Sequence, residues 1–190
     1  MAPLNKHKLI FILLYFFNLM SADNFDFKNY SVADGLSEST INVIHEDQNG
    51  FIYLGTENGL MMFDGIKFFN YKMNIFDDLS ILGNNILSIY EDKKGYIWVG
   101  TELGLSRLDP RFRTFKRIEH NEKYDLKNVE KIIEDEHRNI WIQCSGGVFR
   151  YIISEDNLLC ISCGDFNEIT SFSKIFGTQS NNVIISSFSD

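Results

Sequence analysis

Three pairs of adjacent carboxylates are the residues of this sequence that most readily suggest catalysis. In each pair a glutamate precedes an aspartate: Glu46/Asp47, Glu91/Asp92 and Glu134/Asp135. Two carboxylates can act as the general acid and base of a glycosidase when they converge at one point. These pairs instead recur at one position of a repeated segment. We therefore interpret them as turn residues, whose side chains accept backbone N–H groups.

Signatures of metal binding or of a catalytic nucleophile are weak. The acidic segments loosely resemble calcium loops and the Asp-box turns of sialidase-type propellers, but no D-x-[DN]-x-[DN]-G run is present. The sequence also lacks G-x-S-x-G, P-loop, G-x-G-x-x-G and H-E-x-x-H motifs. We expect no catalytic residue, no cofactor and no metal in this chain. The histidines share no metal-ligand spacing, and His45 is interpreted as a partly buried strand residue: His7, His45, His120 and His137.

The cysteines allow two interpretations. There are three of them, Cys144, Cys160 and Cys163, so at least one is left unpaired within the chain. In an oxidising compartment Cys160 and Cys163 could form a local disulfide, and a redox-active C-x-x-C is the alternative. A redox pair usually lies in a βαβ context, which this sequence does not predict. A structural or free thiol is therefore the default interpretation.

The acidic pairs belong to a repeat, whose clearest copy is EDKKGYIWVGTELGL at 91–105. The other copies are EDQNGFIYLGTENGL at 46–60 and EDEHRNIWIQCSGGV at 134–148, so the start recurs after 45 and then after 43 residues. In each copy an apolar strand leads to the acidic turn, and a strand rich in aromatic and β-branched residues follows it. Hairpin turns then lead to a third and a fourth strand.

Four antiparallel strands in about 45 residues form one blade of a β-propeller. We therefore predict an all-β fold, a partial β-propeller of four-stranded antiparallel blades that occupies 23–190. Its repeats lie at about 31–71, 78–118 and 124–165, with a partial repeat at 167–190. In that last part, Ile169 to Ile175 and Asn182 to Ser187 are the expected first and second strands. The segment Phe25 to Tyr30 resembles the fourth strand of a blade.

Turn carboxylates, glycines and large aromatic residues make up the repeat signature. The aromatic residues Tyr53, Trp98 and Trp141 could stack on sugar rings, but we interpret them as packing between blades. The third copy departs from the pattern, because Arg138 replaces the turn glycine and Gln143-Cys144 replaces Gly-Thr. The signature residues, to which we assign structural roles, are Asp47, Gly50, Tyr53, Gly55, Gly59, Asp92, Gly95, Trp98, Gly100, Gly104, Asp135, Trp141 and Gly147.

This pattern, ED-x-x-G-x-I-W-x-G-T-x-x-G-L preceded by DGLS at 34–37, resembles the two-component regulator propeller repeat. The resemblance covers Phe25 to about Ile153, with weaker traces to the end. It implies the periplasmic sensor part of a hybrid histidine kinase of the Bacteroidetes type. By that resemblance the propeller senses an extracellular small ligand, often an oligosaccharide, and acts with a homodimer partner and the rest of the sensor chain. The ligand-binding residues are unknown.

The first 22 residues differ from the rest of the chain. Lys6 and Lys8 precede a 12-residue apolar run from Leu9 to Met20, interrupted only by Asn18, which is too short to span a bilayer comfortably. The pattern predicts a helical signal peptide at 1–22, cleaved after Ala22, with an uncleaved anchor as the alternative. Since a closed propeller needs about four to eight blades, we expect the chain to be a fragment of a longer sensor. A small complete protein that closes by oligomerising is the other possibility.

Charge and motifs narrow the choice of function. A net charge of −8 disfavours nucleic acid as a partner. The kinase motifs themselves are absent from these residues, so we expect a sensor segment without enzyme activity. The alternatives are a secreted propeller enzyme acting on carbohydrate, as a lyase or a glycosidase, and a protein-binding scaffold. Saturable binding without turnover would separate the sensor from the enzyme.

Overall fold

The structure is a computed structural model that describes residues 27–118, 125–163, 171–177 and 183–189. The predicted signal peptide at 1–22 lies outside these described residues. Within the described part of the chain, no helix is long and apolar enough to cross a bilayer.

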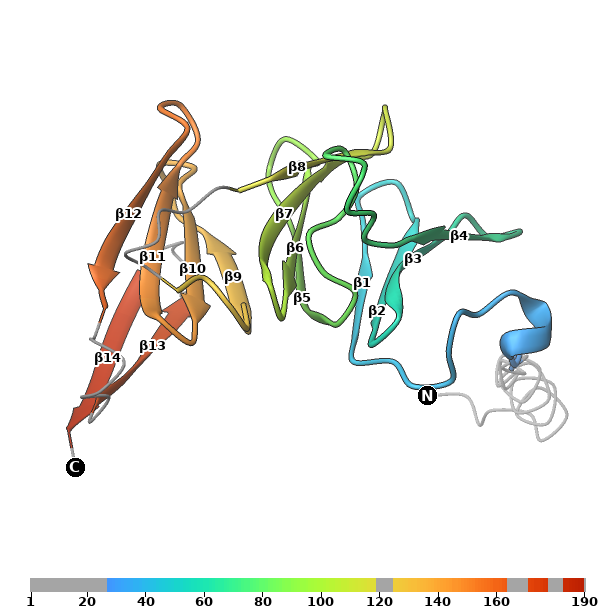
Figure 1. Cartoon of the computed structure of the whole chain (residues 1–190), viewed down its shortest axis with the longest axis horizontal. Helices are drawn as coiled ribbons and strands as arrows, with labels where there is room; N and C mark the ends of the chain where they lie inside the picture. The colour runs from blue at the N-terminus through green and yellow to red at the C-terminus, as the bar shows by residue number, and fades with distance from the viewer. Residues whose placement is uncertain (1–26, 119–124, 164–170, 178–182, 190) are drawn as a thin grey trace, which may run out of the picture.

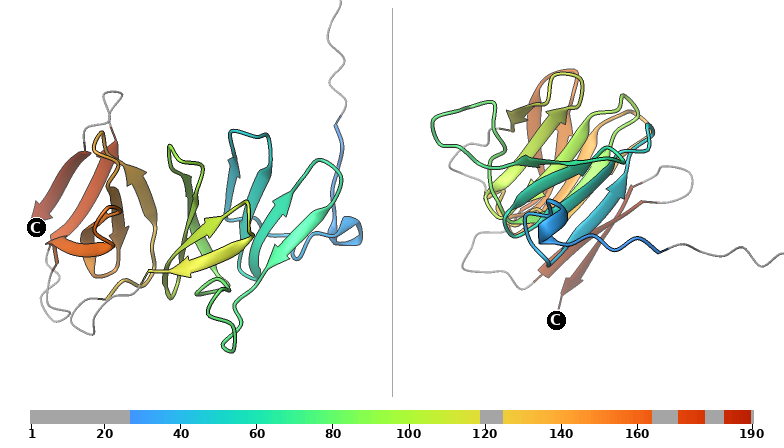
Figure 2. Two further views of the ribbon diagram at one scale, coloured as in Figure 1. Left: turned by 90° about the horizontal axis from the view of Figure 1, so that it is seen from above. Right: turned by 90° about the vertical axis from the view of Figure 1, so that its right-hand side faces the viewer.

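The described fold is all-β, which confirms the predicted class. Its strands form three four-stranded antiparallel sheets and one two-stranded sheet, each with its strands in chain order. Figure 1 shows these sheets side by side, from β1–β4 on the right to β13 and β14 on the left, and Figure 2 shows them from two further directions. The elements are η1 (Val32–Asp34), β1 (Val43–Glu46), β2 (Ile52–Thr56), β3 (Gly59–Phe63), β4 (Phe68–Tyr71), β5 (Ile86–Glu91), β6 (Ile97–Thr101), β7 (Gly104–Asp109), β8 (Thr114–Arg117), β9 (Lys131–Glu134), β10 (Ile140–Cys144), β11 (Gly147–Ile152), β12 (Asn157–Ser162), β13 (Ser171–Gly177) and β14 (Val183–Ser189).

Each four-stranded sheet is one copy of the repeat. We call β1–β4 blade 1, β5–β8 blade 2 and β9–β12 blade 3, and β13 with β14 the fourth strand pair. The hairpins between second and third strands are tight in blades 1 and 2 because of a Thr-x-x-Gly sequence. In blade 2, Thr101 Oγ1 accepts the N–H groups of Leu103 and Gly104 at 3.2 and 3.1 Å. Gly104 has a φ of 145°, a conformation that favours glycine.

The apolar core lies between the blades. One cluster joins Tyr53 and Leu60 of blade 1 to Ile97 and Leu108 of blade 2, and all four side chains are fully buried. A second cluster, which includes Trp98, joins blades 2 and 3 in the same way. Strand β5 lies against β1 and β2, and β9 lies against β5 and β6, so the first strands of successive blades are neighbours. This arrangement is that of consecutive propeller blades.

The fourth strand pair continues the series with a changed sequence. Strand β13 lies against β9, β10 and β11 of blade 3. The register of β13 with β14 sets Gly177 opposite Val183, just as Glu91 stands opposite Ile97 in blade 2. The pair therefore has a glycine where the complete blades carry their glutamate.

The prediction that Phe25 to Tyr30 forms a strand is wrong for the residues that the structure describes. Residues 27–30 have no strand hydrogen bonds, and the 3-10 helix η1 follows them. The ring of Tyr30 instead packs edge-on against Phe63 and Phe68, with centroids 5.0 and 5.6 Å away. A fourth strand pairs with a third strand, and β3 is already paired with β2 and β4, so residues 27–30 contact it through side chains only.

Candidate functional site

The aspartate of each acidic pair organises the first turn of its blade. In blade 2, Asp92 Oδ1 accepts the backbone N–H groups of Lys94 and Tyr96 at 2.9 and 3.1 Å. Gly95 supplies the positive φ, 81°, that this turn requires. Asp92 is 1% exposed, so its carboxylate is a buried acceptor for the turn.

An indole N–H completes the bonding of this aspartate in two blades. Trp98 Nε1 donates to Asp92 Oδ2 at 2.8 Å, and Trp141 Nε1 donates to Asp135 Oδ2 at 2.9 Å. Trp98 is fully buried, and its ring meets the ring of Tyr151 in blade 3 edge-on at 5.5 Å. It therefore has no face open to a sugar. Trp141 is only half-buried.

Blade 1 lacks this bond because Tyr53 stands in the tryptophan position. In blade 1, Asp47 Oδ1 accepts two turn N–H groups as in blade 2. Among the described residues, however, neither Asp47 Oδ2 nor the Tyr53 hydroxyl has a hydrogen-bond partner, although both side chains are buried. Burial, with the nearby Asp47 charge, raises the pKa of the Tyr53 hydroxyl. An unsatisfied buried polar group costs about 1–3 kcal/mol, so blade 1 carries a local defect.

Blade 3 keeps the turn despite losing its glycine. Arg138 takes the glycine position with a φ of 66°. The backbone N–H of Asn139 donates to Asp135 at 2.8 Å, as the equivalent N–H groups of Phe51 and Tyr96 do in the other blades, and the Asn139 side-chain amide adds a bond at 2.9 Å. Burial raises the pKa of the Asp135 carboxyl, but the hydrogen bonds from Trp141 and Asn139 outweigh burial, so the net pKa lies below its ordinary value.

The glutamate of the acidic pair has a different role, because it joins neighbouring blades. Glu91 Oε2 of blade 2 accepts the backbone N–H of Gln48, in the first turn of blade 1, at 3.0 Å. Glu134 Oε2 of blade 3 accepts the N–H of Lys93, in the first turn of blade 2, also at 3.0 Å. We call this contact the glutamate staple. The sequence analysis assigned both carboxylates of the pair to the turn and did not predict the staple. The feature that could have predicted it is the glutamate that precedes the turn aspartate in every copy of the repeat.

Two signature glycines permit the close approach of the blades. A Cβ atom on Gly55 of blade 1 would lie 2.7 Å from Cγ2 of Ile86 in blade 2. A Cβ atom on Gly100 would lie 2.5 Å from the carbonyl oxygen of Val129, which leads into blade 3. Real Cβ atoms essentially never come this close, so larger residues at these positions would push neighbouring blades apart.

One further pair of titratable side chains lies across blades 1 and 2. His45 Nε2 lies 3.8 Å from Glu91 Oε2 across blades 1 and 2, and burial raises the pKa of Glu91. Within the described residues, no group of three or more histidine, cysteine or acidic side chains could hold a metal ion.

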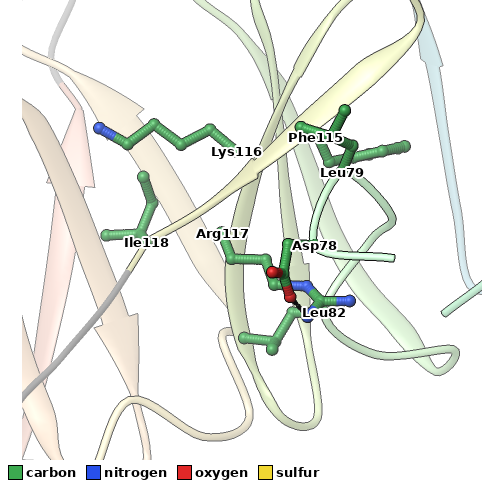
Figure 3. Close-up of a pocket in the computed structure, with 7 residues that line it drawn as sticks. All are labelled: Asp78, Leu79, Leu82, Phe115, Lys116, Arg117 and Ile118. Atoms are coloured by element: carbon green, nitrogen blue, oxygen red, sulfur yellow. Dashed lines mark hydrogen bonds and ion pairs between the residues drawn. The ribbon is translucent and has the colours of Figure 1, made fainter. Parts of the chain in front are cut away.

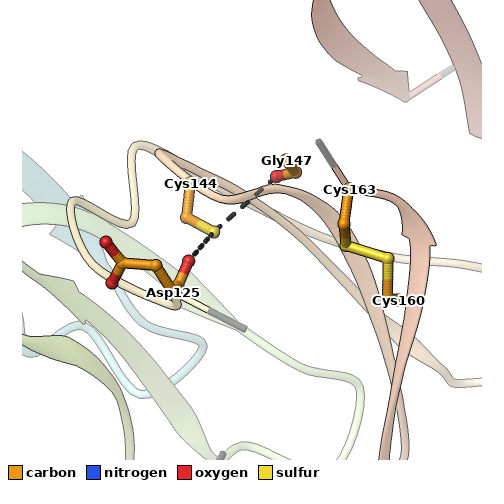
Figure 4. The surroundings of a disulfide bond; sticks show 5 residues. All are labelled: Asp125, Cys144, Gly147, Cys160 and Cys163. Carbon is orange, nitrogen blue, oxygen red and sulfur yellow. Dashed lines mark hydrogen bonds between the residues drawn. A yellow bond between two sulfur atoms is a disulfide. The ribbon is translucent and has the colours of Figure 1, made fainter. Parts of the chain in front are cut away.

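Cys160 and Cys163 form a disulfide at the end of β12, and Cys144 is a buried free thiol (Figure 4). The structure thus contains the local disulfide that the sequence allows. Cys144 takes the hairpin position that Thr101 has in blade 2, and its Sγ contacts the carbonyl oxygens of Asp125 and Gly147. Burial raises its pKa to about 12, and a thiol in that state is a poor nucleophile.

A cavity of about 660 Å³ lies beside β8 and the segment that joins blades 1 and 2 (Figure 3). The repeat signature gave no hint of it. The N–H groups of the Arg117 guanidinium next to it already have acceptors, the carbonyl oxygens of Asn74, Asp77 and Ser80. These hydrogen bonds hold the joining segment in place. The lining residues are Asp78, Leu79, Leu82, Phe115, Lys116, Arg117 and Ile118.

Comparison with known proteins identifies the repeat. The family model of the two-component regulator propeller matches residues 35–58 and 80–102. These ranges include the acidic pair and first turn of blade 1 and the Gly-Thr hairpin of blade 2. A stretch of 58 residues, 30% of this chain, is 43% identical to histidine kinase P4 of Formosa agariphila, of which it covers 4%.

Solved structures share the blade architecture. The extracellular domain of a hybrid two-component system from B. thetaiotaomicron is 25% identical, with a TM-score of 0.62 over 80% of this chain and 21% of that one. PorZ, a surface component of the type IX secretion system of Porphyromonas gingivalis, shares the fold at 19% identity, with a TM-score of 0.54 over 78% of this chain and 23% of its own. The chain thus spans about a fifth of these solved chains. Two of its segments match the two-component regulator propeller repeat, and its blades are similar to those of the extracellular domain of a hybrid two-component system from B. thetaiotaomicron.

Proposed function

We propose that this chain is the ligand-sensing propeller segment of an extracytoplasmic two-component sensor. The observation that carries the proposal is the match of the regulator propeller model to the segments that build the turns of blades 1 and 2. The identity with a histidine kinase and the likeness to an extracellular domain of a hybrid two-component system support it. In this role the segment binds a ligand and performs no catalysis itself.

The proposal includes a larger assembly. The segment is part of a longer hybrid histidine kinase, of which the 190 residues are a fragment. A signal peptide at 1–22 directs it to the periplasm, and the sensor works as a homodimer anchored in the inner membrane.

The ligand in this proposal is an extracellular oligosaccharide, and the cavity beside β8 supports that choice. Leu79, which is 59% exposed, lines the cavity together with the largely buried Phe115, and we infer that they provide an apolar surface for one face of a sugar ring. Asp78, whose side chain is 99% exposed, offers a hydrogen-bonding group at the edge, whereas the Lys116 ammonium is already paired with Asp156. The mixture of an apolar floor and a few polar groups is typical of small-molecule sites.

Isothermal titration of the complete extracellular domain with a panel of neutral oligosaccharides tests the proposal. We expect saturable binding to at least one sugar, no new product in chromatography of the mixture, and weaker binding by the variant Leu79→Ala. Leu103→Ala, which truncates another exposed leucine in the hairpin between β6 and β7, is the matched control and should bind normally. Release of product would favour a carbohydrate-active enzyme, and the absence of any binding would refute sensing of these sugars.

A further inference from the structure

Two turns at the same end of blades 1 and 2 carry exposed apolar side chains at their apices. Ile66, in the turn between β3 and β4, is 90% exposed, and Phe112, in the turn between β7 and β8, is 73% exposed. Figure 1 shows the second of these turns projecting beyond blade 2. Single exposed apolar residues are common on protein surfaces, whereas apolar groups gathered in one place mark an interaction surface.

The ring of Phe69 in β4 shows that the two turns lie side by side. Lys67 of the first turn places its Nζ 4.7 Å from the centre of this ring, and Arg113 of the second turn places its Cζ 4.1 Å from it. A third cation, Arg111, lies 5.6 Å from the centre of the Phe112 ring. Basic groups therefore surround both apolar apices. We call the surface formed by Ile66, Lys67, Arg111, Phe112 and Arg113 the apex surface.

The carboxylates of these two turns are used to fold them. Asp64 Oδ1 accepts two backbone N–H groups of the first turn, at 2.9 and 2.8 Å. Asp109 Oδ1 accepts the backbone N–H of Arg111 at 3.0 Å, and Asp109 Oδ2 pairs with the Arg111 guanidinium at 2.7 Å. Among the described residues, no carboxylate lies within salt-bridge distance of Lys67 or Arg113. The apex surface thus keeps two positive charges without a carboxylate partner.

We propose that the apex surface binds an anionic phospholipid membrane. Ile66 and Phe112 insert between the lipid headgroups, and the neighbouring basic side chains contact the lipid phosphates. Apolar side chains flanked by lysine and arginine are the combination that holds proteins at the surface of anionic bilayers. The net charge of −8 does not prevent this contact, because salt screens charges that lie more than about 8 Å apart. The inference does not depend on ligand sensing, because it rests on these two turns alone.

A sugar or a protein partner fits the apex surface less well than a membrane does. A sugar ring needs an open aromatic face, but cations lie over the rings of Phe69 and Phe112. A stable protein complex buries about 1,200–2,000 Å², whereas the apex surface is confined to two turns. The corresponding turn of blade 3 carries Glu155 and Asp156 instead of basic residues. A membrane requires only that the two apices enter the headgroup layer.

Tryptophan quenching by brominated lipids tests the contact at a single residue. The Phe112→Trp variant of the full chain is mixed with vesicles of phosphatidylcholine and phosphatidylglycerol whose acyl chains carry bromine, which quenches an indole that it touches. Quenching beyond that of the wild type, which has two tryptophans of its own, reports on position 112. The matched control is Phe76→Trp, because Phe76 is 92% exposed but is followed by Asp77 and Asp78. We expect quenching at position 112 and none at position 76.

Cosedimentation with the same vesicles measures the contribution of the cations. Lys67→Gln combined with Arg113→Gln should lower the partition coefficient by about 25-fold, because each basic residue near an anionic surface contributes about a fivefold factor. Lys72→Gln combined with Lys127→Gln removes the same charge at the opposite end of the blades and should leave the partition coefficient nearly unchanged. Residues 1–22 are the same in all these variants, so differences between the variants do not come from them.

Several results would overturn the proposal. One is the absence of quenching at position 112, or equal quenching at positions 76 and 112. Another is equal partition onto vesicles of phosphatidylcholine alone, because the cations would then play no part. A dimer in sedimentation that Phe112→Ser abolishes would make a second copy of the chain the occupant. Binding of an oligogalacturonate that Lys67→Gln abolishes, with no binding to vesicles, would make it an acidic sugar.

Discussion

At the scale of single residues, the same turn is completed differently in different blades. The Trp98 indole donates to Asp92 at 2.8 Å inside the protein. At the equivalent positions of blade 1, the Tyr53 hydroxyl and Asp47 Oδ2 have no partner in the described structure. A side chain that looks interchangeable in the sequence therefore decides whether a buried carboxylate oxygen is satisfied. Comparison of blades 1 and 2 therefore shows how much stability a missing hydrogen bond to the turn aspartate costs.

We predict that Trp98→Phe destabilises the protein, whereas Tyr53→Phe leaves its stability unchanged or increases it. Trp98→Phe removes the donor to Asp92 and leaves a void, so it should lower the free energy of unfolding by about 3 kcal/mol. Tyr53→Phe removes a hydroxyl that has no partner, so the change should be neutral within about 0.5 kcal/mol or stabilising. Urea denaturation of both variants measures the difference. Similar losses in the two variants would contradict the assignment.

The pKa of Asp135 predicts how its contribution depends on pH. Hydrogen bonds hold this pKa below its ordinary value of 3.8 in the folded protein, in spite of burial. The stabilisation by the ionised carboxylate is therefore present above pH 3.8 and is lost as the pH falls through the folded pKa. Comparison of the wild type with Asp135→Asn by denaturation should show a wild-type advantage at pH 7 that shrinks below pH 3.8. A constant advantage for the wild type at all pH values would refute the assignment.

At the scale of elements, the blades are held together by close backbone approach and by the glutamate staples. Gly55 and Gly100 lie where a neighbouring blade leaves no space for a Cβ atom. Glu91 and Glu134 connect each first strand to the turn of the blade before it. The glycine contacts and the staples both lie between repeats, and so do the two apolar clusters, each of which joins two blades.

We predict that Gly100→Ala is more damaging than Gly65→Ala. The new Cβ at position 100 would meet the Val129 carbonyl oxygen at 2.5 Å, and overpacking of this kind costs about 1–3 kcal/mol. Gly65, at a φ of 90°, has open space around it, so alanine there brings only backbone strain of about 1 kcal/mol. Thermal denaturation of both variants gives the comparison. If Gly65→Ala were the more destabilising, close approach of the blades at Gly100 could not be the reason for the glycine.

At the scale of the whole molecule, the repeat made the fold predictable. A 43–45-residue period with two glycine turns is enough to predict four-stranded blades, and the strands follow that prediction within a few residues. The contacts between repeats were harder to predict from the sequence, because a side chain such as Glu91 accepts a hydrogen bond from a residue 43 positions away. Residues 27–30 differ from their predicted strand for a similar reason, since pairing depends on which strand is available nearby. In the turn with Arg138, the side chain of Asn139 supplies one additional hydrogen bond to Asp135, a compensation that no single position reveals.

The most direct test of the account is hydrogen exchange at two backbone amides. If the recurring glutamates hold the blades together, Glu91→Ala should expose the Gln48 amide and leave the Lys93 amide protected. Glu134→Ala should do the reverse, because each carboxylate accepts one of these N–H groups. Nuclear magnetic resonance of the wild type and both variants would detect this crossed pattern. Unchanged protection of both amides in the two variants would contradict the claim that the glutamates hold neighbouring blades together.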